Sequence, residues 1–317
     1  MTDTAGGAAG VARFRRTVLA TCCVPWDENG AFLEEIFRDS VRNLAATGLR
    51  DLYVFGTAGE GYAVSEAVFD VVVQAFVDEA RANDVTPMVG VISLSLATML
   101  ERIERTAALG VREFQVTLPS WGALNAAELR RFFHEVCDRF PQLQFLHYNL
   151  PRAGRVLTPS DYAPLVEAHP NLVATKFGGA DLRAIVEYNT KVRQLRHFHT
   201  ELGFAHAALA GEPGLLPAIS VVKAGLPHAL FDAGVARDAP RLMSLSAEIA
   251  SARDLLMATA DPGAHMDGAY DKLYSKLHDP RFPLRLLPPY QGASDGWYQR
   301  LHGALKESLP QWLPTGF

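Results

Sequence analysis

An alternation of strand-like and helix-like segments is the feature that most restricts what this chain can fold into. Short apolar runs alternate with amphipathic stretches, which is typical of a parallel α/β protein. Successive strands begin roughly 20 to 36 residues apart, the size of one strand–helix unit. The candidate strands are Thr17–Cys22, Asp51–Phe55, Pro87–Ile92, Glu113–Leu118, Gln144–Asn149, Leu172–Lys176, Leu195–Thr200 and Leu216–Val221. Eight such units predict a (β/α)8 TIM barrel; a doubly wound open sheet, which usually has fewer strands, is the alternative.

Capping signals mark the ends of several intervening helices. Asn125 with Glu128 resembles a capping box, and Thr158 with Pro159 reads as a cap followed by proline at the first helical position. Gly48 is a stop signal for the helix expected after the first strand. These signals place helices between strands, as the barrel requires.

The strand signal ends after Val221, and the rest of the chain looks helical. Helices are expected at about His228–Thr259, Asp267–Leu277 and Ser294–Leu309. We therefore divide the chain into a disordered tail at 1–12, the barrel at 13–227 and a C-terminal helical region at 228–317. The first dozen residues lack the apolar core of a signal peptide.

The composition is that of an ordinary soluble globular protein, with 49% apolar residues and a net charge of −5 over 317 residues. Such a charge gives no electrostatic footprint for nucleic acid or an anionic membrane, and no apolar run reaches transmembrane length. Three cysteines are too few for a disulfide framework, and no metal-ligand spacing occurs. We expect a cytoplasmic protein with no metal and no cofactor.

Lys176 is the first candidate for chemistry, because it ends an apolar strand just before two glycines. Burial of an ammonium costs hydration and favours the neutral amine, which is a nucleophile toward ketones. The structural alternative is a lysine at a strand end that extends to water. The active site of a barrel lies at the C-terminal ends of its strands, where Lys176 would be.

Two more polar residues fall at strand ends. Tyr148 ends the fifth strand, and Thr57 follows the second strand in a glycine-rich turn that runs from Gly56 to Gly61. A tyrosine there is more often a packed ring, and glycines there usually make a tight turn. The turn lacks the G-x-G-x-x-G spacing of a dinucleotide site, but its backbone N–H groups could bind a small carboxylate.

The order and spacing of these motifs resemble the dihydrodipicolinate synthase / N-acetylneuraminate lyase family. The resemblance rests on Gly56-Thr57-Ala58-Gly59-Glu60, Tyr148-Asn149-Leu150-Pro151, the strand that ends in Lys176, and Ala218-Ile219-Ser220-Val221 with Pro227 behind it. It covers nearly the whole chain after the first dozen residues. It implies a (β/α)8 barrel with a C-terminal helical part, assembled as a homotetramer or homodimer.

The resemblance also implies a class I aldolase mechanism. Lys176 would form an imine with pyruvate or a related 2-oxo acid, and Tyr148 would pass protons to and from it. Thr57, with the backbone of Gly56 and Ala58, would bind the carboxylate, and the carbonyl of Ile219 would line the pocket. Glu60 would brace the glycine-rich turn.

Several positions depart from the synthase pattern. Trp121 stands where a synthase has a proton-relaying tyrosine, and an indole cannot shuttle a proton as a phenol does. Ala153 replaces the arginine that binds an aldehyde's carboxylate, and Arg152, one position early, is expected to point elsewhere. With Phe177 after the lysine, Trp121 would make the acceptor side apolar. The tryptophan after the fourth strand and the aromatic residue after the lysine resemble those of the hydratase-aldolases that cleave benzylidenepyruvates.

We therefore expect a Schiff-base lyase or aldolase that acts on pyruvate and an apolar or aromatic aldehyde. The enzymatic alternative is a 2-keto-3-deoxy sugar-acid aldolase or dehydratase, or a dihydrodipicolinate synthase-like enzyme, and a polar acceptor pocket would favour a sugar acid. A non-catalytic 2-oxo-acid sensor or scaffold is the alternative of another class. His147 is expected to face the helices, His199 to be structural, and Lys223 to lie past the strand end without a role as nucleophile.

Overall fold

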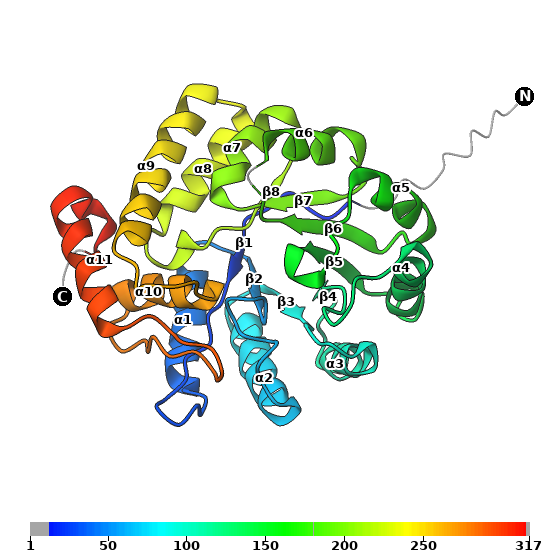
Figure 1. Ribbon diagram of the computed structural model, residues 1–317, viewed down its shortest axis with the longest axis horizontal. Coiled ribbons are helices and arrows are strands. Elements are labelled where there is room, and N and C mark those ends of the chain that lie inside the picture. The colour runs from blue at the N-terminus through cyan, green and yellow to red at the C-terminus, as the bar shows by residue number, and fades with distance from the viewer. Residues whose placement is uncertain (1–12, 180, 315–317) are drawn as a thin grey trace, which may run out of the picture.

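The computed structural model describes residues 13–179 and 181–314. Eight parallel strands lie side by side in chain order, and helices surround them (Figure 1). A bridge between Val18 and Leu215 joins the first strand to the last, so the sheet closes into a barrel. The strands are β1 Leu19–Thr21, β2 Asp51–Val54, β3 Thr86–Gly90, β4 Glu113–Val116, β5 Gln144–Asn149, β6 Leu172–Phe177, β7 Arg196–His199 and β8 Gly214–Leu215. The predicted TIM barrel is confirmed; the predicted tail at 1–12 lies outside the described residues.

Helices follow the strands on the outside of the barrel. They are α1 Glu34–Ala46, α2 Glu66–Ala82, α3 Leu96–Ala108, α4 Ala126–Phe133, α5 Pro159–Ala168, α6 Leu182–Lys191, α7 Glu201–Ala210 and α8 Gly225–Ala236. Both predicted helix starts are confirmed. The Asn125 side chain accepts hydrogen bonds from the backbone N–H groups of Ala127 and Glu128, at 2.9 and 3.0 Å, and Thr158 caps α5.

Side chains of each strand alternate between the barrel interior and the layer under the helices. Tyr148 and Lys176 face inward, whereas His147 faces α5 and bonds to the Tyr162 hydroxyl at 2.6 Å. The prediction for His147 is therefore confirmed. The interior holds a small apolar core of its own, made of Phe14, Leu19, Tyr53, Met88, Leu146, Val173, Ala174, Phe198 and Leu216.

The eighth strand is shorter and earlier than predicted. It ends at Leu215, and residues Ile219–Val221 form a 3₁₀ turn instead of a strand. Pro217 explains the difference, because it has no N–H to donate to a strand ladder. The apolar character of Leu216–Val221 predicts a strand. In the structure, apolar residues of this segment lie instead at the C-terminal end of the barrel, where several line the cavity.

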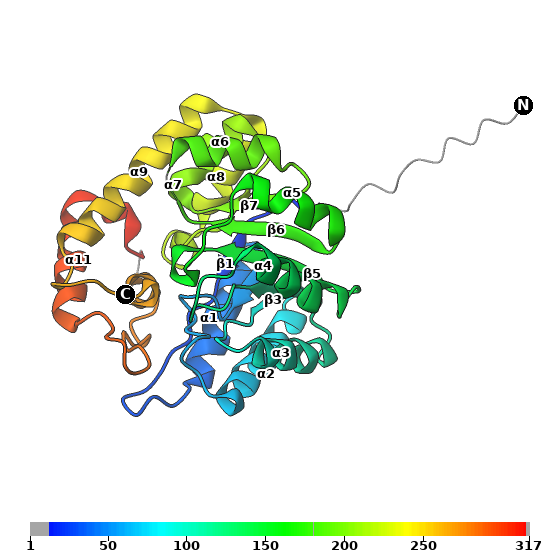
Figure 2. The ribbon, with the colours of Figure 1, turned by 45° about the vertical axis from the view of Figure 1, so that its right-hand side comes forward.

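Three further helices follow the barrel: α9 Ala239–Ala258, α10 Asp267–His278 and α11 Asp295–Ser308. Figure 2 shows α9 and α11 beside the barrel. The helical character predicted for about 228–259 is confirmed, and the segment is divided into α8 and α9 because Arg237 takes a left-handed conformation (φ 54°) between them. The division at residue 227 stays a prediction, and α8 crosses it. In the described ranges, no helix is both long and apolar enough to cross a membrane.

Candidate active site

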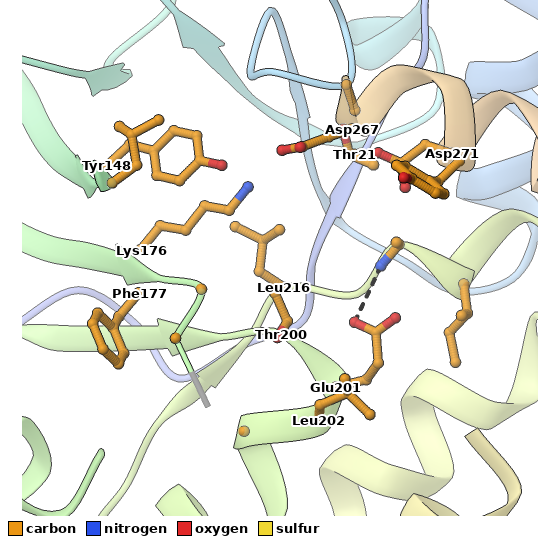
Figure 3. Close-up of a pocket in the computed structure, with 18 of the residues that line it drawn as sticks. Thr21, Tyr148, Lys176, Phe177, Thr200, Glu201, Leu202, Leu216, Asp267 and Asp271 are labelled. Atoms are coloured by element: carbon orange, nitrogen blue, oxygen red, sulfur yellow. Dashed lines mark hydrogen bonds between the residues drawn. The ribbon is translucent and has the colours of Figure 1, made fainter. Parts of the chain in front are cut away.

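A cavity of about 850 Å³ opens at the C-terminal ends of the strands. Its walls come from the ends of β5, β6 and β7, from the segment after β8, and from α9 and α10 (Figure 3). Lys176 and Tyr148 both line it. This is the end of a barrel at which active sites form.

Lys176 lies on β6, opposite Tyr148 of β5 in the strand register. Its side chain is only 8% exposed, and its Nζ donates a hydrogen bond of 3.2 Å to the hydroxyl of Tyr53. Nζ also lies 4.1 Å from the centroid of the Tyr148 ring. The amine is thus held between two phenols.

The charge on Lys176 differs from the expectation that burial alone would leave the amine neutral. Burial does lower the pKa of Lys176, but Tyr148 and Tyr53, and then Asp267, act against it, so the pKa is raised overall. A raised pKa favours the ammonium form of the resting side chain, and only the neutral amine is nucleophilic.

Thr57 does not line the cavity, but it contacts Tyr148, which does. Its hydroxyl donates a hydrogen bond of 3.4 Å to the Tyr148 hydroxyl. Of the other predicted binding residues, Ala58 and Ile219 line the cavity, and Gly56 lies under the wall. A Cβ on Gly56 would come within 2.5 Å of the Tyr53 ring, so glycine is required there for close packing.

Glu60 braces the glycine-rich turn, as expected. It is fully buried, in a left-handed conformation (φ 61°), and accepts hydrogen bonds from Trp26 Nε1 at 2.8 Å and the Leu287 N–H at 2.6 Å. The ammonium of Lys272, on α10, pairs with the same carboxylate at 2.5 Å. The turn after β2 is therefore fastened directly to the C-terminal helices.

The two residues expected to make the acceptor side apolar do not do so. Trp121 lies in the loop after β4, is 88% exposed and is not on the cavity wall. Phe177 reaches the wall, but its ring packs against Tyr188 and His199, away from the cavity (Figure 3).

Arg152 also differs from its prediction. It lines the cavity and does not point elsewhere. Its guanidinium forms hydrogen bonds of 2.8 and 3.3 Å with the two carboxylate oxygens of Asp267, the first residue of α10. That pairing occupies the fork that would otherwise bind a substrate carboxylate.

The remaining candidates have structural contacts outside the cavity. His199 bonds through Nε2 to the side-chain amide of Asn189 at 2.9 Å, and burial lowers its pKa to about 3. Its structural role is confirmed. Lys223 donates its hydrogen bond to the backbone carbonyl of Gln311. Neither residue contributes to the cavity wall.

Sequence reasoning missed the wall that α10 provides. Asp267, Tyr270, Asp271 and Tyr274 lie at i, i+3, i+4 and i+7, so they share one helix face, and all four line the cavity. The sequence does carry a signal for this wall. A helix face that packs on a core is apolar, whereas this face consists of Asp, Tyr, Asp and Tyr, which indicates a polar cavity.

Charged groups complete this wall. Glu201, at the start of α7, and Arg253, on α9, also face the cavity. Burial raises the pKa of Glu201, whose carboxylate accepts a hydrogen bond of 3.4 Å from the Ala218 N–H. In the ranges that the structure describes, no group of three His, Cys, Asp or Glu side chains is placed to hold a metal ion.

Comparisons with known proteins agree with this architecture. A 4-hydroxy-tetrahydrodipicolinate synthase from an Exiguobacterium species is 26% identical over 273 residues, which cover 84% of this chain and 90% of that protein. The structure of YagE, an E. coli K12 protein of the dihydrodipicolinic acid synthase family in complex with pyruvate, superimposes with a TM-score of 0.82 at 16% identity, covering 93% of this chain and 99% of that one. N-acetylneuraminate lyase from Proteus mirabilis gives a TM-score of 0.80 at 16% identity, with 94% and 99% covered. The sequence model of the dihydrodipicolinate synthetase family matches residues 14–259, so the chain belongs to that family.

Proposed function

We propose that this protein is a carbon–carbon lyase of the class I aldolase type, which forms a Schiff base between Lys176 and pyruvate or a related 2-oxo acid. The observation that carries the proposal is the buried amine of Lys176, held between the phenols of Tyr53 and Tyr148 at a cavity wall. The E. coli relative described above was solved with pyruvate, which supports this substrate.

The chain's own residues supply the steps. The ammonium of Lys176 gives one proton to the keto oxygen through the Tyr148 hydroxyl, and Nζ attacks the keto carbon of the 2-oxo acid. Tyr148 then carries a second proton from the same nitrogen to the hydroxyl of the carbinolamine, which leaves as water as the protonated imine forms, and Thr57 holds the phenol in place. The imine withdraws electrons, so carbon 3 can lose a proton or the bond to an acceptor carbon. The turn at 56–58 reaches the cavity at Ala58, whose backbone N–H would hold the carboxylate.

The groups that face the cavity bear on the identity of the acceptor aldehyde. An apolar or aromatic aldehyde, with or without a hydration step, was favoured by Trp121 and Phe177, but neither ring faces the cavity. The carboxyl and phenol groups of α10 favour the second candidate, a hydroxylated acceptor such as that of a 2-keto-3-deoxy sugar acid. The pairing of Arg152 with Asp267 weighs against an anionic aldehyde and so against synthase activity.

Borohydride trapping with pyruvate, followed by peptide mass spectrometry, tests the proposal directly. We expect a reduced pyruvyl adduct on Lys176, and none in the Lys176→Ala variant, which should keep its fold and lose turnover. Lys223→Ala is the matched control, since that lysine lies outside the cavity and should leave the adduct unchanged. Wild-type protein that binds pyruvate without an adduct would favour the sensor hypothesis.

We further propose that the chain forms a homotetramer or homodimer in the cytoplasm. The exposed indole of Trp121, 88% accessible in one chain, is the kind of surface aromatic that subunit contacts cover. Sedimentation analysis at several concentrations measures the assembly state, and a monomer at all of them would refute this part of the proposal.

A further inference from the structure

The helix α10 places two carboxyl groups on the cavity wall, and the proposed mechanism uses neither of them. Three carboxyls face the cavity: Glu201 on α7 and Asp267 and Asp271 on α10 (Figure 3). Asp267 is engaged by Arg152, and Glu201 by the backbone N–H of Ala218. Among the residues that the structure describes, none donates a hydrogen bond to the Asp271 carboxyl.

The surroundings of Asp271 favour its protonated form. Burial raises its pKa well above the usual value, the nearby Asp267 raises it further, Lys176 of β6 lowers it, and Glu201 raises it. Arg253 of α9 faces the same cavity. A carboxylic acid with a raised pKa holds its proton more tightly than an ordinary one and can give it to an oxygen atom in the cavity.

The position of Asp271 is fixed by its neighbour in sequence. Lys272 forms the buried ion pair with Glu60 on a different face of α10, and its Nζ also contacts the carbonyl of Arg285. The helix is thereby anchored to the turn that carries Thr57. Such anchoring holds Asp271 at a constant position relative to Lys176 and Tyr148.

The proton path on the other wall is short. Tyr148 is joined to Thr57. Trp121 lies outside the cavity, and its indole N–H can only donate a hydrogen bond. Tyr148 and Lys176 can serve the keto carbon of the 2-oxo acid. An acceptor aldehyde bound beside that carbon would need a proton donor of its own.

We propose that Asp271 is the catalytic acid and base for the acceptor oxygen in the carbon–carbon bond step, an inference that rests on the function proposed above. In the direction of addition, the enamine carbon on Lys176 bonds to the aldehyde carbon. The carbonyl π electrons move to the aldehyde oxygen, which takes the proton of Asp271. The products are an iminium on Lys176, a hydroxyl group and the Asp271 carboxylate. Cleavage reverses each transfer.

Two partial reactions separate this role from imine formation. Borohydride trapping reports the imine, and exchange of the C3 protons of pyruvate in D2O reports the enamine, and neither needs an acceptor. Addition is measured with pyruvate and D-glyceraldehyde, benzaldehyde or succinic semialdehyde, using the aldehyde that wild-type protein consumes fastest. The variants are Asp271→Asn and Asp271→Glu. Asp254→Asn, exposed on α9 and off the cavity wall, is the control.

We expect Asp271→Asn to keep the adduct and C3 exchange within about threefold and to slow addition by roughly 10²–10⁴-fold. Asp271→Glu should recover part of the rate with a displaced pH profile, and Asp254→Asn should match wild type. Addition by Asp271→Asn within about threefold of wild type, or an equal loss of C3 exchange and addition, would overturn the proposal. So would wild-type protein that exchanges C3 protons and consumes none of the aldehydes. Absence of the wild-type adduct would instead refute the proposed function.

Discussion

Tyr148 and Lys176 are register partners on the adjacent strands β5 and β6, and the Lys176 Nζ lies 4.1 Å from the centroid of the Tyr148 ring. The strand pairing itself therefore positions the proposed nucleophile and its proposed proton carrier. Because both side chains extend from inward-facing positions on paired strands, the distance between them is set by the strands, which are the rigid elements of the barrel.

The role of Tyr148 can be tested by removing only its hydroxyl. Tyr148→Phe keeps the ring that packs on Lys176 but removes the group that Thr57 holds. We expect C3 proton exchange of pyruvate to slow by roughly 10²–10⁴-fold, the usual share of general acid–base catalysis. NMR in D2O measures it, and circular dichroism controls for folding. Exchange near the wild-type rate would move the proton transfer to water or another group.

The raised pKa of Lys176 predicts how imine formation depends on pH. Below that pKa the neutral, nucleophilic fraction grows tenfold with each pH unit. We expect the initial rate of adduct formation to rise from pH 7 to pH 9. Protein and pyruvate are mixed at each pH and quenched after a fixed interval into borohydride at one common pH. A rate that does not change with pH would show that the ammonium proton is lost only after pyruvate binds.

The buried ion pair between Glu60 and Lys272 predicts a large loss of stability when one partner is removed. Lys272→Met leaves the Glu60 carboxylate charged and buried, at a cost of about 3–5 kcal/mol in unfolding free energy. Urea denaturation measures this. The double variant Glu60→Gln with Lys272→Met should recover part of the loss. If Lys272→Met were as stable as wild type, the pair would not be what fastens the turn.

Three buried histidines predict acid sensitivity. Burial lowers the pKa of His147 to about 3, of His197 to about 4 and of His199 to about 3. The unfolded chain takes up protons as the pH falls below about 6.5, while the folded protein does not until about 4. Each histidine therefore removes about 1.4 kcal/mol of stability per pH unit in that window. Urea midpoints at pH 7, 6 and 5 test this; identical midpoints would contradict it.

The strand ends on the barrel could be predicted from the sequence because their signal is local. An apolar run that ends in Lys176, and another that ends in Tyr148 and Asn149, gave β5 and the end of β6 to within one residue. Helix caps at Asn125 and Thr158 were equally local. The eighth strand failed because apolar character alone cannot distinguish a strand from a turn that packs over the barrel.

The rest of the candidate site depends on contacts between distant segments. Tyr53 faces the Lys176 amine because strand alternation turns it inward, which the sequence permitted but did not single out. Asp271 reaches the cavity only because the C-terminal region folds back over the strand ends. The directions of the Arg152 and Trp121 side chains depend on the conformations of the loops that carry them, which the spacing of motifs does not predict.

The contacts of Glu60 also govern when the site can exist during synthesis. Its carboxylate is matched to Lys272, 212 residues further along the chain, and to the N–H of Leu287, 227 residues further along. Until that part of the chain has left the ribosome, the turn that carries Thr57 lacks the partners that compensate a buried charge. We expect a nascent barrel to be inactive, and catalytic activity to appear only after the C-terminal helices have been synthesised.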